Sequence, residues 1–163
     1  MAQPKVIQFK KPIFPVSNAL NEYLQRHTRS SKIPIEYDDL KRFTETIPKL
    51  DEQGQPTLWS TVMFHHYEID EIYDKLVDLY QILVADGGHL DYLRVDSVDF
   101  CMYGNSQPFR IKILNELNDN FDYYYIKKAD SSRIYGLELE HLLSPNRINF
   151  IHQNGTLVEE HII

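Results

Sequence analysis

The chain has 163 residues, of which 42% are hydrophobic and only six are glycine, a composition typical of a folded domain and not of a disordered segment. Its 24 acidic residues outnumber its 17 basic residues and give a net charge of -7, so a basic surface for nucleic acid is not expected. The single cysteine, Cys101, excludes an internal disulfide and a thiolate-rich zinc site, and favours a reducing compartment.

The chain has no apolar run long enough to act as a secretory signal or to cross a membrane, so we expect a cytoplasmic protein without a membrane partner. Residues 1–90 are expected to form a mainly helical N-terminal region, although the first 60 residues hold six of the eight prolines. Short helices are predicted around residues 16–26 and 37–46, and a turn or linker at residues 51–56.

The strongest helical pattern runs from about Glu68 to Ala85. Its apolar residues recur at a spacing of three to four, which predicts that one stripe of the helix packs on a neighbour. The residues expected to be buried are Ile72, Leu76, Leu79 and Leu83. The pair Gly87-Gly88 is expected to end this helix.

The densest cluster of possible metal ligands precedes this helix and consists of His65, His66, Glu68 and Asp70. Adjacent side chains on a helix or a strand do not face one site, so we expect no metal centre here. We interpret these residues as a polar approach to the helix, with the acids near its positive end.

After Gly88 the pattern changes to the alternation typical of strands. The expected order of residues 91–163 is β-β-β-α-β-β, with strands at about 92–103, 109–113, 121–128, 147–151 and 156–163 and a helix at about 132–143. Asp130 or Ser131 is expected to cap the helix, and Asn154-Gly155 is a hairpin signal. The predicted fold is therefore α+β: a helical N-terminal region followed by a five-stranded antiparallel sheet with one packed helix.

One acidic residue of the expected helix lies on its apolar side. The apolar arc of that helix consists of Ile134, Leu137, His141 and Leu142. At 100° per residue, Glu138 falls inside this arc and Glu140 falls outside it. A carboxylate in an apolar stripe needs a partner, unless its side chain reaches solvent. Arg133 and Arg147 are possible structural partners.

Three further segments carry a resemblance to known enzymes. They are YGNSQPFRIKI at 103–113, YYYIKKAD at 123–130 and TLVEEHII at 156–163. Together with the order of the elements, they resemble the small lobe of protein-kinase-like and aminoglycoside-phosphotransferase-like enzymes over about residues 92–163. The first segment lacks the full G-x-G-x-x-G of protein kinases, and an ordinary hairpin turn is the alternative interpretation of it.

The resemblance implies that the complete enzyme uses ATP with Mg, and that a lysine on the third strand holds the phosphates. That lysine would be Lys127 or, on the opposite face of the sheet, Lys128, and Glu138 would be its partner. The other nucleotide contacts implied are Gly104, Asn105 and Ser106 at the phosphates, and Glu160, His161 and Ile162 beside the adenine.

The resemblance ends at Ile163, at the hinge, before the catalytic and metal-binding residues of a second lobe would follow. We therefore name no catalytic residue, and we expect neither phosphotransfer nor a bound cofactor for this chain alone. A missing C-terminal lobe or a partner chain is expected to cover the hinge edge, if the parent reading frame continues. The alternative is a non-catalytic interaction or scaffold domain with a similar sheet.

Overall fold

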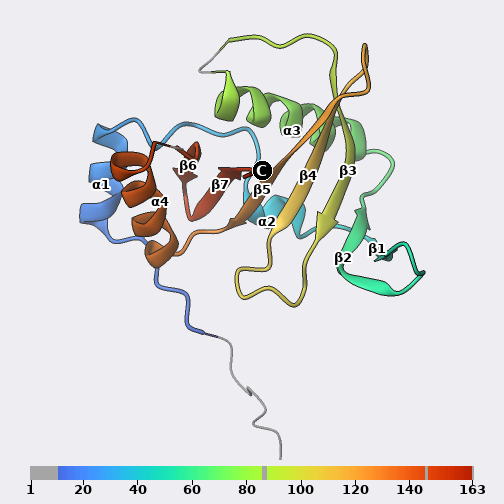
Figure 1. The fold of residues 1–163 in the computed structure, drawn as a ribbon, viewed down its shortest axis with the longest axis horizontal. Helices are drawn as coiled ribbons and strands as arrows, with labels where there is room; N and C mark the ends of the chain where they lie inside the picture. The colour runs from blue at the N-terminus through green and yellow to red at the C-terminus, as the bar shows by residue number, and fades with distance from the viewer. Residues whose placement is uncertain (1–10, 86–87, 146, 163) are drawn as a thin grey trace, which may run out of the picture.

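The computed structural model describes residues 11–85, 88–145 and 147–162. Its helices are α1 (Asn18–Arg26), α2 (Tyr37–Leu40), α3 (Ile69–Val84) and α4 (Ser131–Leu143). Its strands are β1 (Glu45–Leu50), β2 (Pro56–Met63), β3 (Leu93–Phe100), β4 (Phe109–Asn115), β5 (Phe121–Lys128), β6 (Phe150–Gln153) and β7 (Thr156–Glu160). The strands form one antiparallel sheet in the order β1-β2-β3-β4-β5-β7-β6 (Figure 1).

The main core lies between α3 and one face of this sheet, which we call the α3 face (Figure 1). The helix buries Ile72, Leu76, Leu79 and Leu83, as its spacing predicts. Every second residue of the central strands packs into this core on the α3 face, because successive side chains of a strand point to opposite faces of the sheet. The strand residues of this core include Val95, Val98, Phe100, Phe109, Ile111, Ile113, Tyr124, Ile126, Ile151 and Val158.

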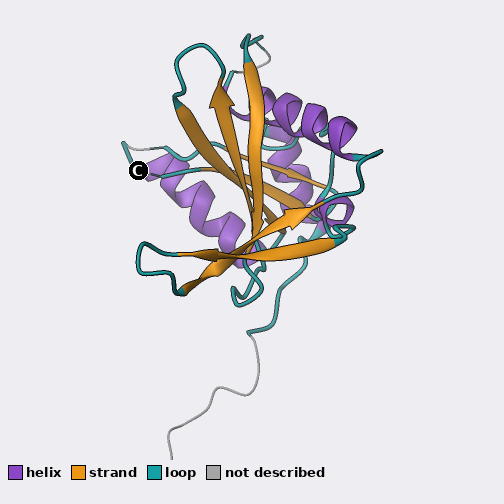
Figure 2. Ribbon diagram, turned by 90° about the vertical axis from the view of Figure 1, so that its right-hand side faces the viewer, coloured by secondary structure: helices purple, strands orange, loops and turns teal. Residues whose placement is uncertain are grey.

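A second, smaller core lies on the opposite face, which we call the α4 face. Helices α1 and α4 pack side by side there, over the β6–β7 end of the sheet (Figure 1). The buried residues of this core are Leu20, Leu24, Ala129, Ile134, Leu137, Ile148, Phe150 and Leu157. Helices therefore lie on both sides of the twisted sheet, as Figure 2 shows.

The order β-β-β-α-β-β of the second half is confirmed, and its first three strands pair antiparallel as predicted. Asp130 is the N-cap of α4, and its carboxylate accepts a hydrogen bond from the backbone N–H of Ser132. The hairpin signal is also confirmed, because Asn154 and Gly155 both adopt positive φ angles, of 49° and 77°. Of the Gly87-Gly88 pair, Gly87 lies outside the described residues.

The predicted number of five strands is wrong, because residues 45–63 add a hairpin to the sheet. This hairpin consists of β1 and β2, and β2 pairs with β3. The helix expected at residues 37–46 ends at Leu40, and residues 1–90 are therefore not only helical. Pro48 lies in β1, which is an edge strand, where a missing N–H is tolerated. The predicted turn at residues 51–56 closes the hairpin.

None of the helices in the described ranges is long and apolar enough to cross a membrane. Cys101 is a buried free cysteine that directly follows β3.

Candidate functional site

A row of polar side chains crosses the α4 face of the sheet. Cross-strand pairing brings together Thr61 of β2, Asp99 of β3, Arg110 of β4, Tyr125 of β5 and Glu159 of β7, each beside the next. The α3 face has apolar residues at most of the neighbouring positions. The row therefore gives the α4 face a polar character that the α3 face lacks.

Lys127 lies on this face, two residues after Tyr125, and forms an ion pair with Glu159 on the neighbouring strand. Glu159 is 3% exposed, and its second cation is Arg133 of α4, whose Nε lies 2.7 Å from Oε1. The two cations come from different elements and converge on one carboxylate. Lys128, the alternative lysine, is exposed at the end of β5.

Glu138 is buried and Glu140 is exposed, as their positions on the helix predict. The predicted partner of Glu138 is wrong, however. Its carboxylate accepts a hydrogen bond from Tyr23 Oη at 3.0 Å and pairs with Arg29 Nε at 3.1 Å. Glu138 lies five residues after Arg133 on the helix, so its side chain points about 140° around the helix axis from that of Arg133. Glu138 therefore faces α1, whereas Arg133 faces the strand that carries Glu159.

His141 and Leu142 do not share the buried face with Ile134 and Leu137. His141 is only partly buried and Leu142 is 62% exposed. The buried arc of α4 is thus narrower than the sequence predicts, because α1 covers only one side of the helix.

The loop between β3 and β4 contains Gly104, Asn105 and Ser106 and is folded back on itself. The Cys101 N–H donates to the carbonyl of Pro108, and the Tyr37 hydroxyl donates to the carbonyl of Gln107 at 2.8 Å. Gly104 packs closely here, since an added Cβ would lie 3.1 Å from Pro108 Cδ. Because Phe109 pairs with Ile126, the loop lies at the same end of the sheet as Lys127.

The three predicted hinge residues follow different paths. Glu160 accepts hydrogen bonds from the backbone N–H and the side chain of Asn149. His161 Nδ1 lies 2.8 Å from Tyr125 Oη, which brings this ring to the polar row. Ile162 is 60% exposed.

Sequence reasoning missed a buried charge network at the other end of the row. Asp99 is fully buried, and its carboxylate accepts hydrogen bonds from Thr61 Oγ1 at 2.9 Å, Lys49 Nζ at 3.0 Å and Arg110 at 2.8 Å. Burial alone would raise the pKa of Asp99, but the hydrogen bonds from Arg110, Lys49 and Thr61 outweigh it and hold the pKa below its usual value.

The guanidinium of Arg110 is also held between two aromatic rings. Its central carbon lies 4.3 Å from the centroid of the Trp59 ring and 5.1 Å from that of Tyr123. The signal that could have found this network is a charged residue between Val98 and Phe100, opposite an arginine on the next strand.

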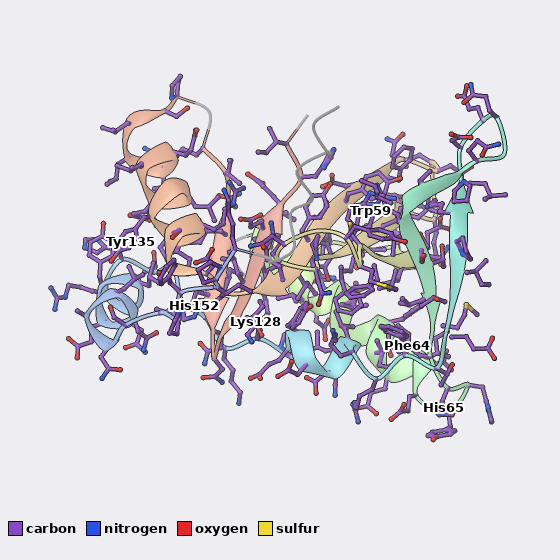
Figure 3. The ribbon with its side chains drawn as sticks, turned by 90° about the horizontal axis from the view of Figure 1, so that it is seen from below. Trp59, Phe64, His65, Lys128, Tyr135 and His152 are labelled. Atoms are coloured by element: carbon purple, nitrogen blue, oxygen red, sulfur yellow. The ribbon has the colours of Figure 1, made fainter. Side chains whose placement is uncertain are left out.

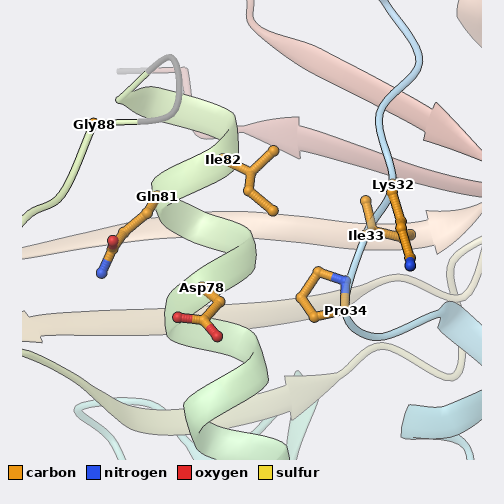
Figure 4. Close-up of a pocket in the computed structure, with 7 residues that line it drawn as sticks. All are labelled: Lys32, Ile33, Pro34, Asp78, Gln81, Ile82 and Gly88. Atoms are coloured by element: carbon orange, nitrogen blue, oxygen red, sulfur yellow. The ribbon is translucent and has the colours of Figure 1, made fainter.

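Away from this face, a cavity of about 430 Å³ lies between α3 and the segment before α2 (Figure 4). Its lining residues are Lys32, Ile33, Pro34, Asp78, Gln81, Ile82 and Gly88. Lys32 and Asp78 are exposed, so water already solvates its charged groups. Among the described residues, no three His, Cys, Asp or Glu side chains gather as metal ligands, and the rings of His65 and Tyr67 stack on each other.

Comparison of the chain with protein-family models, with curated proteins and with solved structures finds no match.

Proposed function

We propose that about residues 92–163 form the ATP-holding small lobe of a kinase-like phosphotransferase, with Lys127 as the phosphate-binding lysine. The pairing of β5 with β7 is the observation that carries this proposal. It brings the strand that contains Lys127 beside the strand that leads to His161. A nucleotide that is held by both its phosphates and its base needs two such strands at one site.

The charges around Lys127 support the same proposal. Lys127 and Arg133 share one carboxylate, so two positive charges and one negative charge leave the cluster with a net charge of +1. The side chains of Lys127 and Arg133 are 15% and 45% exposed, which lets a phosphate approach both. In this proposal Glu159 takes the orienting role that the resemblance implies for Glu138.

Acylation by an ATP derivative tests the proposal even if nucleotide affinity is low. A derivative with an acyl group on its γ-phosphate transfers that group to a lysine amine held against the phosphates. We expect Lys127 to be acylated about tenfold faster than other lysines, because proximity raises the effective concentration of the reacting groups. Mass spectrometry of the digested chain identifies each modified lysine, and an excess of MgATP should slow the reaction at Lys127 alone.

Lys112 is the matched control in the same chain. It lies on the α4 face of β4, its side chain is 25% exposed, and it pairs with Asp96 in the way that Lys127 pairs with Glu159. Equal acylation of Lys112 and Lys127, or a rate at Lys127 that MgATP does not change, would contradict the proposal.

The second candidate function is a non-catalytic interaction or scaffold domain. One observation favours it: α4 exposes Tyr135, Leu139, Leu142 and Leu143, and a cavity of about 600 Å³ lies between α4 and α1. Exposed apolar patches of this kind mark binding surfaces in many proteins. The acylation experiment separates the two candidates, because an interaction domain gives Lys127 no advantage over Lys112.

A further inference from the structure

A histidine of the edge strand β6 is buried at the end of the sheet. His152 lies on the α4 face, like its strand neighbour Phe150 and the residue opposite it, Leu157, which both belong to the second core. Figure 3 shows His152 on the side of the molecule where α1 lies, whereas His65 lies at the opposite end. The ring of His152 is therefore part of the packing between α1 and the sheet.

The imidazole of His152 is buried without a hydrogen bond. The residue is 4% exposed, and neither ring nitrogen has a hydrogen-bond partner among the described residues. A buried polar group without a partner is unfavourable, and a buried charge without a partner is more unfavourable still, because it loses its hydration. Burial accordingly lowers the pKa of His152. The folded ring therefore stays neutral at a pH at which an exposed histidine takes up a proton.

The charged groups of the elements around His152 have other partners or are exposed. The partnered groups are Arg29 with Glu138, Glu159 with Lys127 and Arg133, Glu36 with Asn154, and Asp130 with the backbone N–H groups of Phe14 and Ser132. The exposed ones are Glu22, Arg26, His27 and Lys128. His141 of α4 is a further titratable ring, and its pKa is lowered by burial and then by the charges of Arg29 and Arg147. No described carboxylate hydrogen-bonds to the His152 ring, so a proton there has no counter-charge in contact.

The segment that follows α1 covers the free edge of β6. The backbone N–H of His152 donates to the carbonyl of Arg29 at 2.9 Å, and Ser30 Oγ donates to Gln153 Oε1 at 3.1 Å. We call these two contacts the β6 latch. An edge strand presents unpaired N–H and C=O groups, and here Arg29 and Ser30 occupy them in place of another strand. The latch and the buried ring involve the same residue, so a movement of β6 that lets water reach the ring also breaks the latch.

We propose that the β6 latch is acid-sensitive: at mildly acidic pH, proton uptake by His152 opens the contacts of Arg29 and Ser30 with β6. In the open state water reaches the ring, which then titrates at the ordinary histidine pKa of about 6.5. The closed state, with its lower pKa, binds fewer protons. The latch is therefore most stable above pH 6.5 and loses stability as the pH falls from 6.5 towards the folded pKa. It uses neither Lys127 nor a nucleotide, so it goes beyond the proposed function.

Hydrogen exchange of the His152 amide measures the opening, because this N–H donates to Arg29 only while the latch is closed. We expect its opening constant, corrected for the intrinsic exchange rate, to rise about fivefold between pH 6.5 and pH 5.5. This factor follows if the ring titrates at about 6.5 in the open state and stays neutral in the closed state. The amide of Leu79 in α3 should have an opening constant at least about tenfold smaller at both pH values, because it exchanges only when the main core unfolds.

The His152→Leu variant removes the titrating ring and keeps an apolar side chain beside the second core. In this variant the opening constant should change less than about twofold between pH 6.5 and pH 5.5. His65→Leu is the matched control, because His65 is exposed and lies at the other end of the molecule (Figure 3). This control should keep the rise of about fivefold.

The NMR signals of the His152 ring in the wild type decide the question if His152→Leu does not fold. They should remain those of a neutral ring in the closed state at pH 5.5. Three outcomes would overturn the proposal: a protonated ring whose amide stays protected, one common opening constant for the His152 and Leu79 amides, or no rise in exchange with acid. A rise that disappears in His141→Gln and persists in His152→Leu would also overturn it, because His141 would then be the sensor.

Discussion

Three acidic side chains are buried in the described part of the chain, and each one joins elements that are distant in the sequence. Asp99 of β3 joins β1 and β4, Glu159 of β7 joins β5 and α4, and Glu138 of α4 joins the N-terminal region. Removing one partner of a buried ion pair leaves the remaining charge buried and uncompensated. The resulting loss of stability is larger than the stability that the intact pair adds relative to apolar residues of similar volume. These carboxylates therefore specify which elements pack together.

We predict that Asp99→Asn destabilises the protein by about 1–3 kcal/mol at pH 7, because Arg110 and Lys49 lose their charged acceptor. The folded pKa of Asp99 lies below its unfolded value. Its contribution to stability is therefore complete above the unfolded pKa of about 3.9 and is lost as the pH falls through the folded pKa. Urea unfolding of both proteins at pH 7 and at pH 3 measures this, and the difference should shrink at pH 3.

The control for that prediction is Asp78→Asn, since Asp78 is exposed on α3. Its effect should stay within about 0.5 kcal/mol at both pH values. A difference between wild type and Asp99→Asn that is the same at pH 3 and pH 7 would show that the charge of Asp99 contributes nothing.

At the level of the single residue, the sequence predicted burial better than partners. The position of Glu138 on its helix was enough to predict that it is buried. The identity of its partner depends on Arg29, which is 109 residues away along the chain. Periodicity within one helix contains no information about such a distant contact, and the same is true of the pair formed by Lys127 and Glu159.

The helix α3 is the element whose burial the sequence predicts most fully. Its stripe of Ile72, Leu76, Leu79 and Leu83 packs on the α3 face, and Leu76 is fully buried. We predict that Leu76→Ala lowers the free energy of unfolding by about 2–5 kcal/mol, through lost burial and a residual cavity. Asp78→Ala on the exposed side of the same helix is the control. Chemical denaturation measures both, and a loss below about 1 kcal/mol for Leu76→Ala would show that this face is wrongly assigned.

The hairpin of β1 and β2 is the element that sequence analysis missed. Most residues of β1 are exposed, and Ile47 and Leu50 are more than half exposed, so the strand has no alternation of buried and exposed residues. Prolines at positions 48 and 56 also weaken the pattern of a strand. Edge strands that bury little side-chain area give a weak periodic signal, whereas central strands such as β4 give a clear one.

At the scale of the whole molecule, contacts cross the boundary expected near residue 90. β2 of the first part pairs with β3 of the second part, and α1 packs against α4 in the second core. Domains that fold separately have few contacts across their boundary. The shared sheet and the shared core therefore favour one cooperative unit over two independent ones.

We predict a single unfolding transition for the whole chain. Trp59, the only tryptophan, lies in β2 and reports on the first part through its fluorescence, while far-UV circular dichroism reports on all elements. The two probes should give the same urea midpoint, because a two-state transition has no intermediate in which β2 is free.

Leu24→Ala provides the sharper test. Leu24 is fully buried in the second core, on the α4 face, and this substitution should cost about 2–5 kcal/mol. In one cooperative unit, the loss at α1 lowers the midpoint seen by Trp59 as much as that seen by circular dichroism, although Trp59 belongs to β2 near the other edge of the sheet. A Trp59 midpoint that stays unchanged while the circular dichroism midpoint falls would show that α1 and α4 unfold independently of the β2 region.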